Sequence, residues 1–135
     1  WPLDAKSDIS MNHIMFGEVN AWFFKALGGI FPDEEQPGFK NVILKPNFVS
    51  GLNHFSVSHK GPYGKIVSSW KRTGKMVEYK VEIPAGSTAT LYLTASEIRE
   101  NGKSLLENKG VAVSKTSEQR FELQLKPGKY LFGIQ

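Results

Sequence analysis

The residues best placed to do chemistry near the start of the chain are Asn12 and His13, which open a long apolar run. An amide and an imidazole side by side can hydrogen-bond the hydroxyl groups of a neutral ligand. A single histidine with no patterned partner is, however, more often a structural or capping residue. The two residue types alone therefore leave a binding role and a capping role open.

The remaining histidines and the nearby carboxylates form no recognisable catalytic or metal-binding pattern. His54 and His59 lie on a predicted strand and have no acidic partner at the spacing that metal ligands use. Paired carboxylates would suggest glycoside hydrolysis, but Asp4 and Asp8 lie in a polar segment and Glu18 falls on the polar stripe of a predicted helix. The pattern also lacks a phosphate loop and a nucleotide fingerprint. We therefore predict no catalytic residue, no metal site and no cofactor.

Two aromatic residues of the predicted strand region, Tyr63 and Trp70, could stack on a sugar ring. Aromatic residues in strands more often belong to the core, so this pattern also has two interpretations. With both rings exposed on one face, the chain would be an independent carbohydrate-binding module. With neither a pocket nor such a face, it would be a structural or assembly domain without a ligand.

The overall composition excludes several classes of protein. The 135 residues include no cysteine, which rules out disulfides, thiolate metal sites and a cysteine nucleophile. The net charge is +4, but the 17 lysines and arginines are scattered along the chain rather than clustered, so we expect no nucleic-acid partner. No run reaches the roughly 18 apolar residues of a membrane span, and we expect no membrane partner.

A helical period dominates residues 10–30. Ser10 or Asn12 can cap the first turn, Gly28 and Gly29 stop the helix, and Pro32 prevents its resumption. Apolar side chains recur at steps of three and four residues: Met15, Phe16, Val19, Trp22, Phe23, Ala26, Leu27 and Ile30. This apolar side is too wide for a free surface helix, which indicates the end of a larger helical domain. Left uncovered, it would favour self-association of the chain.

The period changes to two after a linker predicted over residues 31–38. Alternating residues and intervening turns predict seven or eight short antiparallel strands; the candidates are residues 42–44, 54–58, 65–70, 77–83, 89–93, 121–125 and 130–134. We predict a mostly β fold, an antiparallel two-sheet β-sandwich of jelly-roll-like form preceded by one long apolar α-helix. The predicted division is a helical remnant over residues 1–36 and a sandwich domain over residues 37–135, with residues 39–135 able to fold without the helix.

Several motifs follow one another in a characteristic order. Residues 10–30 contain Ser-Met-Asn-His, Phe-Gly-Glu-Val, Trp-Phe and a Leu-Gly-Gly-Ile ending; downstream come Pro37-Gly38-Phe39-Lys40-Asn41, Leu44-Lys45-Pro46, Pro62-Tyr63-Gly64-Lys65-Ile66, Ser69-Trp70, Ile83-Pro84-Ala85, Thr88-Ala89-Thr90 and Glu100-Asn101-Gly102-Lys103. In this order they resemble the last barrel helix and the C-terminal domain of bacterial α-L-rhamnosidases, glycoside hydrolase family 78. Each piece is weak alone, but together they cover essentially the whole chain.

The resemblance implies an (α/α)6-barrel enzyme with a C-terminal β-sandwich, which hydrolyses terminal α-L-rhamnose with inversion by means of two carboxylates. Trp1 resembles the tryptophan that follows the general base, so both catalytic carboxylates would precede this chain and the fragment alone would be inactive. His13 corresponds to a histidine that touches the bound sugar, with Asn12 in support. The partner of the whole protein would be a rhamnose-containing carbohydrate, and analogy with exported relatives implies a periplasmic or extracellular protein.

Overall fold

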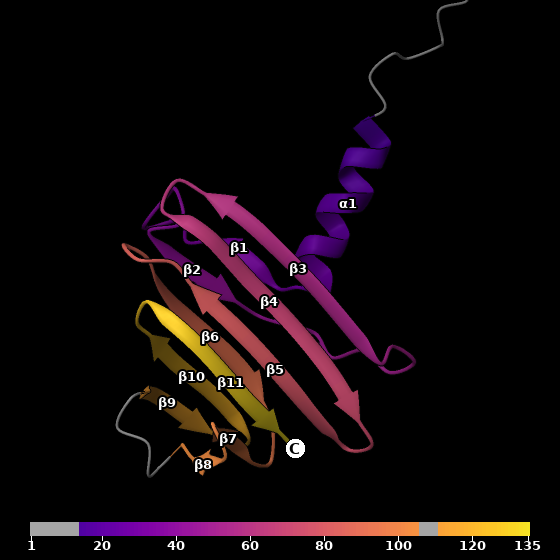
Figure 1. Ribbon diagram of the computed structural model, residues 1–135, viewed down its shortest axis with the longest axis vertical. Helices are drawn as coiled ribbons and strands as arrows, with labels where there is room; N and C mark the ends of the chain where they lie inside the picture. The colour runs from indigo at the N-terminus through magenta and orange to yellow at the C-terminus, as the bar shows by residue number, and fades with distance from the viewer. Residues whose placement is uncertain (1–13, 106–110) are drawn as a thin grey trace, which may run out of the picture.

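The predicted order of one helix followed by many strands is confirmed. A computed structural model describes residues 14–105 and 111–135 (Figure 1). Within these residues, α1 (Ile14–Ala26) precedes eleven strands: β1 (Ile30–Pro32), β2 (Asn41–Leu44), β3 (His54–Gly61), β4 (Gly64–Thr73), β5 (Met76–Ile83), β6 (Thr88–Thr94), β7 (Ile98–Glu100), β8 (Lys103–Ser104), β9 (Ala112–Ser117), β10 (Arg120–Leu125) and β11 (Gly128–Ile134). The described part contains no helix with the length and apolar character needed to cross a membrane.

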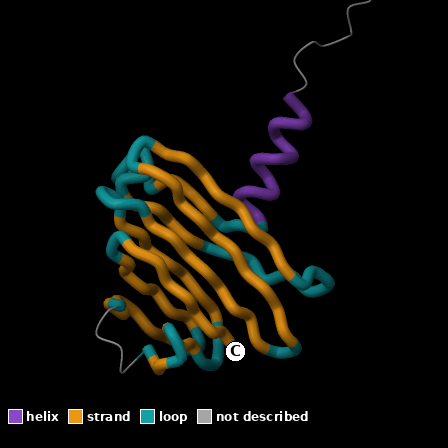
Figure 2. Tube along the Cα trace, viewed as in Figure 1, coloured by secondary structure: helices purple, strands orange, loops and turns teal. Residues whose placement is uncertain are grey.

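The strands form two stacked sheets, as predicted. One has the order β1-β2-β6-β10-β9 and the other the order β3-β4-β5-β11-β7-β8. Figure 2 shows the two layers of strands and the helix leaving them at one corner. One pairing departs from the antiparallel expectation, because β2 runs parallel to β6. A parallel pair needs a long crossover, and here β3, β4 and β5 of the opposite sheet supply it.

The core lies between the sheets and follows the predicted alternation. Along β5 the buried residues are Val77, Tyr79, Val81 and Ile83, and the intervening side chains face outward. The three largest fully buried side chains are Trp70, Tyr79 and Phe132. Phe48 lies edge-on to both Trp70 and Tyr79, with ring centroids 5.7 and 5.6 Å away. The burial of apolar surface between two amphipathic sheets thus accounts for the fold.

The predicted linker is wrong at its beginning. Residues 30–32 form β1, which pairs with β2, and Ile30 is only 1% exposed. A strand of three residues is too short to show a period, which is why the pattern missed it. The acidic stretch that follows is a turn, in which Asp33 accepts hydrogen bonds from the Asn41 side chain at 2.8 Å and the Glu35 amide at 3.0 Å. Both bonds hold the pKa of Asp33 below its usual value, and the bond from Asn41 has the larger effect.

The division of the chain at residues 36 and 37 stays a prediction. Strand β1 lies on the N-terminal side of that division, although its hydrogen bonds place it in the sandwich. The short strands β7, β8 and β9 were also absent from the predicted set. They lie toward one end of their sheets, where two to six residues leave little alternation to detect.

Candidate functional site

The junction between α1 and the sandwich is the feature with the clearest functional consequence. The helix ends where the Gly29 amide bonds the Lys25 carbonyl at 3.0 Å. Gly29 has a φ of +63°, a backbone conformation that glycine adopts without strain. Its carbonyl accepts a hydrogen bond from the Lys45 amide at 2.8 Å, and a Cβ built on Gly29 would lie 2.1 Å from the Lys45 oxygen. The chain can therefore leave the helix and enter the five-stranded sheet only through glycine here.

A buried hydroxyl pair ties the same junction to the other sheet. Ser68 of β4 is fully buried and donates its one hydrogen to the Gly28 carbonyl at 2.6 Å. Tyr79 of β5 lies 3.0 Å from the Ser68 oxygen, so Tyr79 is the donor in that second bond. Burial raises the pKa of Tyr79 well above its usual value, which keeps the phenol protonated for this role. The pair satisfies the carbonyl of Gly28, which lies two residues beyond the last residue of α1 and has no partner within the helix.

Close packing reinforces these hydrogen bonds. A Cβ at Gly28 would lie 2.2 Å from a methyl group of Val57 in β3, so the helix end presses directly on this strand. His59, two residues further along β3, lies between two aromatic rings: Phe24 of α1 at 5.5 Å and Phe39 at 4.5 Å between centroids. The end of α1 is thus attached to both sheets at once, which fixes the direction in which the helix leaves the sandwich.

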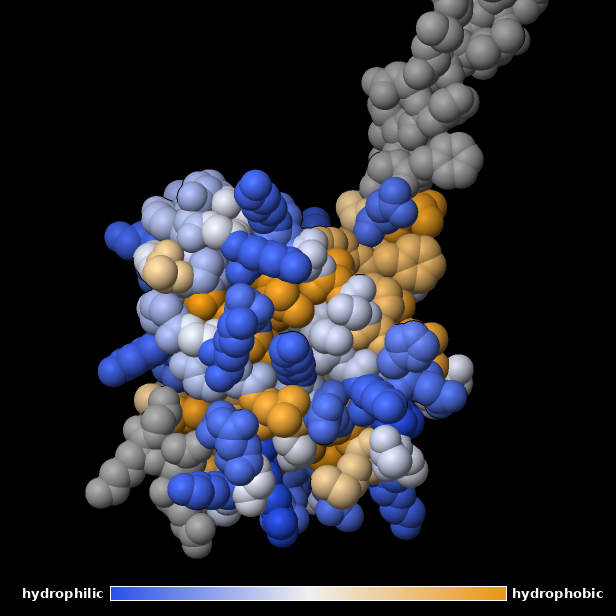
Figure 3. Space-filling view, viewed as in Figure 1, coloured by the Kyte–Doolittle hydropathy of each residue, from blue (hydrophilic) through white to orange (hydrophobic). Residues whose placement is uncertain are grey.

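The side of α1 beyond the junction is apolar and exposed. Val19, Trp22 and Phe23 are 50%, 59% and 44% exposed. The Trp22 and Phe23 rings contact each other edge-on, with centroids 5.2 Å apart. Figure 3 shows this apolar surface continuing from the sandwich onto the helix. The helix does not fold back on the sandwich, so the surface has no cover among the described residues.

The residues singled out from the sequence are distributed unevenly. Asn12 and His13 lie outside the described residues, which begin at Ile14 of α1. His54 is exposed, and the described part of the chain holds no group of three His, Asp or Glu side chains able to bind a metal. Trp70 is 1% exposed and Tyr63 is 43% exposed, so the two rings do not form a stacking face together.

Sequence reasoning missed the hydroxyl anchor at Ser68. The sequence did contain a sign of this anchor. Ser68 occupies an inward position of β4 between Ile66 and Trp70, where the alternation predicts an apolar residue. A polar residue at such a position needs a buried partner. The identity of that partner, 40 residues earlier in the chain, could not be read from the pattern.

Comparison with known proteins agrees with the sandwich and its helix. The family described as bacterial alpha-L-rhamnosidase C-terminal domain matches residues 29–105. An alpha-L-rhamnosidase of Formosa agariphila is 32% identical over 124 residues, which is 90% of this chain and 13% of the relative. An alpha-L-rhamnosidase of Alteromonas sp. (strain LOR) is 32% identical over 80 residues, 59% of this chain and 8% of the relative. This chain therefore spans only a small part of the relatives it matches.

Two solved structures share the fold. The alpha-L-rhamnosidase of Streptomyces avermitilis, complexed with L-rhamnose, has a TM-score of 0.75 at 16% identity, covering 93% of this chain and 12% of that one. The alpha-L-rhamnosidase from Dictyoglumus thermophilum has a TM-score of 0.76 at 23% identity, covering 91% and 14%. The resemblance seen in the motifs is confirmed by the family match, which extends over more than half of the residues. The chain belongs to the bacterial alpha-L-rhamnosidase C-terminal domain family.

Proposed function

We propose that this chain is the C-terminal portion of an inverting α-L-rhamnosidase, whose whole protein removes terminal α-L-rhamnose from glycans or glycosides. The family of the chain and the names of its much longer relatives support this. The observation that supports a place beside a helical barrel is the junction between α1 and the sandwich. There α1 is attached to both sheets, while Trp22 and Phe23 on its free side are exposed. A helix held in this way is suited to being covered by further helices of the same protein.

The helix and the sandwich have separate roles in the proposed whole protein. The helix α1 is the last helix of the catalytic barrel, and Asn12 and His13 just before it reach the bound sugar. The sandwich is a packing module beside the barrel, and β1 completes its five-stranded sheet. Its contribution to function is mechanical: the Gly28, Gly29 and Ser68 contacts set the position of α1.

The chain alone is expected to be inactive. We expect no release of nitrophenol from an aryl α-L-rhamnoside above the uncatalysed rate, with the whole protein as the positive control. An inverting mechanism needs an acid and a base about 6.5–9.5 Å apart, and we place both upstream of residue 1. Turnover that follows the purified chain and disappears in Glu18→Gln would show instead that a working carboxylate lies within these residues.

His13 is expected to act on the sugar in the whole protein. His13→Ala should lower kcat/KM by about two- to tenfold, because one hydrogen bond to a neutral sugar contributes about 0.5–1.5 kcal/mol. His54→Ala, at an exposed position of β3, is the matched control and should leave kcat/KM unchanged. Equal values for the wild-type protein and His13→Ala would return this histidine to a capping role.

The isolated chain is expected to self-associate through α1. Light scattering should report dimers or larger species, because an exposed apolar patch of this kind drives association. Trp22→Lys with Phe23→Lys should restore the monomer. The control, Tyr63→Lys with Met76→Lys, adds the same charge at exposed apolar positions away from the helix and should leave the association intact. A monomeric wild-type chain would contradict the prediction.

A further inference from the structure

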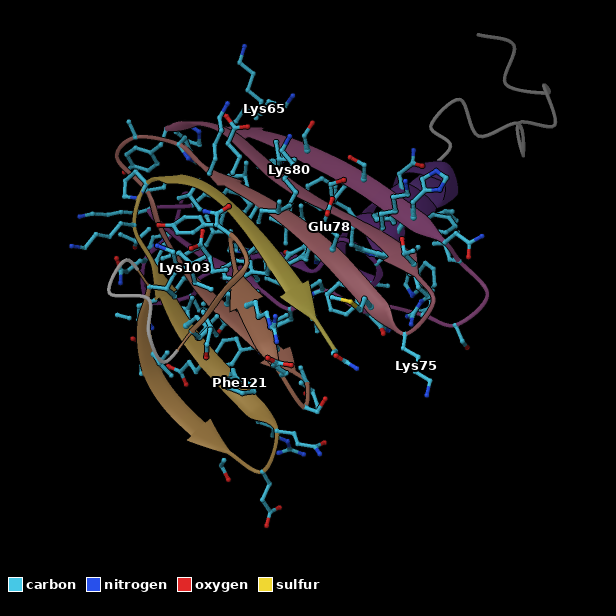
Figure 4. All side chains as sticks on the ribbon, turned by 60° about the horizontal axis from the view of Figure 1, so that its bottom comes forward. Lys65, Lys75, Glu78, Lys80, Lys103 and Phe121 are labelled. Carbon is cyan, nitrogen blue, oxygen red and sulfur yellow. The ribbon has the colours of Figure 1, made fainter. Side chains whose placement is uncertain are left out.

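A cleft at one end of the sandwich has a composition that the packing role does not require. It encloses about 600 Å³ at the end where β4 turns into β5. Its walls come from both sheets, with β6, β10 and the segment after β2 (residues 45–48) on one side and β4, β5 and β11 on the other. Figure 4 looks toward this end, with Phe121 of β10 and Lys75 of the β4–β5 turn labelled on its two sides and Lys65 at the opposite end of β4.

The cleft is strongly cationic. Four basic residues line it: Lys45 after β2, Arg72 of β4, Lys75 of the β4–β5 turn and Arg120 of β10. None of its lining residues is an aspartate or a glutamate. None of the four forms an ion pair with another described residue. The ion pairs among the described residues join Arg99 to Glu97 and Lys129 to Glu82, away from the cleft lining. Four like charges with no side-chain carboxylate among the lining residues repel one another. This arrangement therefore favours an anion from outside the described part of the chain.

Arg72 is the most constrained of the four cations. It occupies an inward position of β4, two residues after the buried Trp70, and its Nη2 donates to the Phe48 carbonyl at 2.6 Å. Its Nε is buried and has no hydrogen-bond partner among the described residues. A guanidinium carries five N–H donors that match the oxygens of a carboxylate or sulfate. Here the fold holds the Arg72 guanidinium at the cleft with a single hydrogen-bond acceptor, the Phe48 carbonyl, among the described residues.

Aromatic residues accompany the charges at the rim. Tyr92 is partly exposed, with the Lys45 ammonium 4.9 Å from its ring centroid, and Phe121 is half-buried. Burial, followed by the negative charges of Glu122 and Asp33, raises the pKa of the Tyr92 phenol. Neither carboxylate lines the cleft. Cations next to aromatic rings suit a ligand that combines anionic groups with the apolar faces of sugar rings.

We propose that this cleft binds an anionic oligosaccharide, one whose sugars carry carboxylate or sulfate groups. The choice of a saccharide over another polyanion rests on the proposed function, because the whole protein would meet such chains while removing rhamnose. The cleft would hold a charged stretch of the substrate outside the catalytic site. Rhamnose itself is neutral and calls for no such cluster of cations.

Titration calorimetry on the 135-residue chain tests this proposal. The probes are a chondroitin sulfate hexasaccharide, a trigalacturonate that carries carboxylates only, the neutral maltohexaose, and hexaglutamate as a polyanion without sugar rings. The test variant is Lys75→Glu with Arg120→Glu. The control is Lys65→Glu with Lys126→Glu, which reverses exposed charges at the other ends of β4 and β10 and brings the net charge from +4 to the same final value of 0.

The expected result is binding of at least one anionic oligosaccharide, weakened about tenfold or more in the test variant and less than about twofold in the control. Binding of trigalacturonate as well as the sulfated probe shows that carboxylates are sufficient for binding; binding of the sulfated probe alone shows that carboxylates on a trisaccharide are not. Equal weakening in both variants, equal affinity for hexaglutamate or maltohexaose, or no binding of either anionic oligosaccharide would overturn the proposal. Rhamnoside hydrolysis by the whole protein is a separate readout, so the two proposals fail independently.

Discussion

Gly29→Ala is expected to destabilise the chain by roughly 2–5 kcal/mol. About 1–2 kcal/mol comes from placing a side chain in the left-handed region, because Gly29 has a φ of +63°. The rest, about 1–3 kcal/mol, comes from overpacking, because the new Cβ would lie 2.1 Å from the Lys45 carbonyl oxygen, a backbone atom that cannot rotate away. Relief of this clash requires β1 to separate from the chain at Lys45.

Gly74→Ala is the matched control. Gly74 has nearly the same φ, +62°, but a Cβ there would meet no atom within 4 Å. Gly74→Ala should therefore lower the free energy of unfolding only by the conformational contribution, about 1–2 kcal/mol. Both variants also restrict the unfolded chain in the same way, so the difference between their unfolding free energies in urea isolates the clash. Hydrogen exchange at the Lys45 amide, which bonds the Gly29 carbonyl, should become faster in Gly29→Ala only. Equal unfolding free energies for the two variants would show that the junction is not rigid.

Removing β1 is expected to have a second large effect on stability. A chain that begins at Gly28 keeps β1 and the bond from Ser68, whereas a chain that begins at Gly38 loses both. The shorter chain should be less stable by roughly 2–4 kcal/mol, because burying Ile30 alone contributes about 1.5–3 kcal/mol and the Ser68 bond about 0.5–1.5 kcal/mol. That is a large fraction of the 5–15 kcal/mol typical of a domain.

The same pair of chains locates the boundary between the two parts. Far-ultraviolet circular dichroism and urea unfolding should show cooperative folding for the chain that begins at Gly28. Ile30→Ala in the 135-residue chain is the point-mutation control, and should reproduce much of the loss without shortening the chain. If the chain beginning at Gly38 is as stable as the longer one, the division at residues 36 and 37 is right and β1 adds nothing to the sandwich.

The sequence by itself determined the local structure and the class of fold. The alternation of residues 77–83 placed Val77, Tyr79, Val81 and Ile83 on one face, and the structure buries all four. The three- and four-residue period predicted the helix, and Gly28 with Gly29 marked its end close to Ala26. These features follow from backbone geometry, which repeats within a few residues and therefore leaves a periodic trace. Motif order supplied the family, while the roles of Asn12 and His13 stay predictions.

Only the tertiary structure decided which distant residues meet. Ser68 bonds a carbonyl 40 positions earlier, and β2 lies parallel to β6 with Asn41 opposite Thr88. Arg72 and Arg120 look like two of many scattered cations in the sequence, yet one cleft brings them together with Lys45 and Lys75. Such contacts depend on how two sheets stack and on which strand ends share one edge. The entropy lost on closing these long loops is offset only when the whole core forms. No local sequence pattern therefore indicates these contacts.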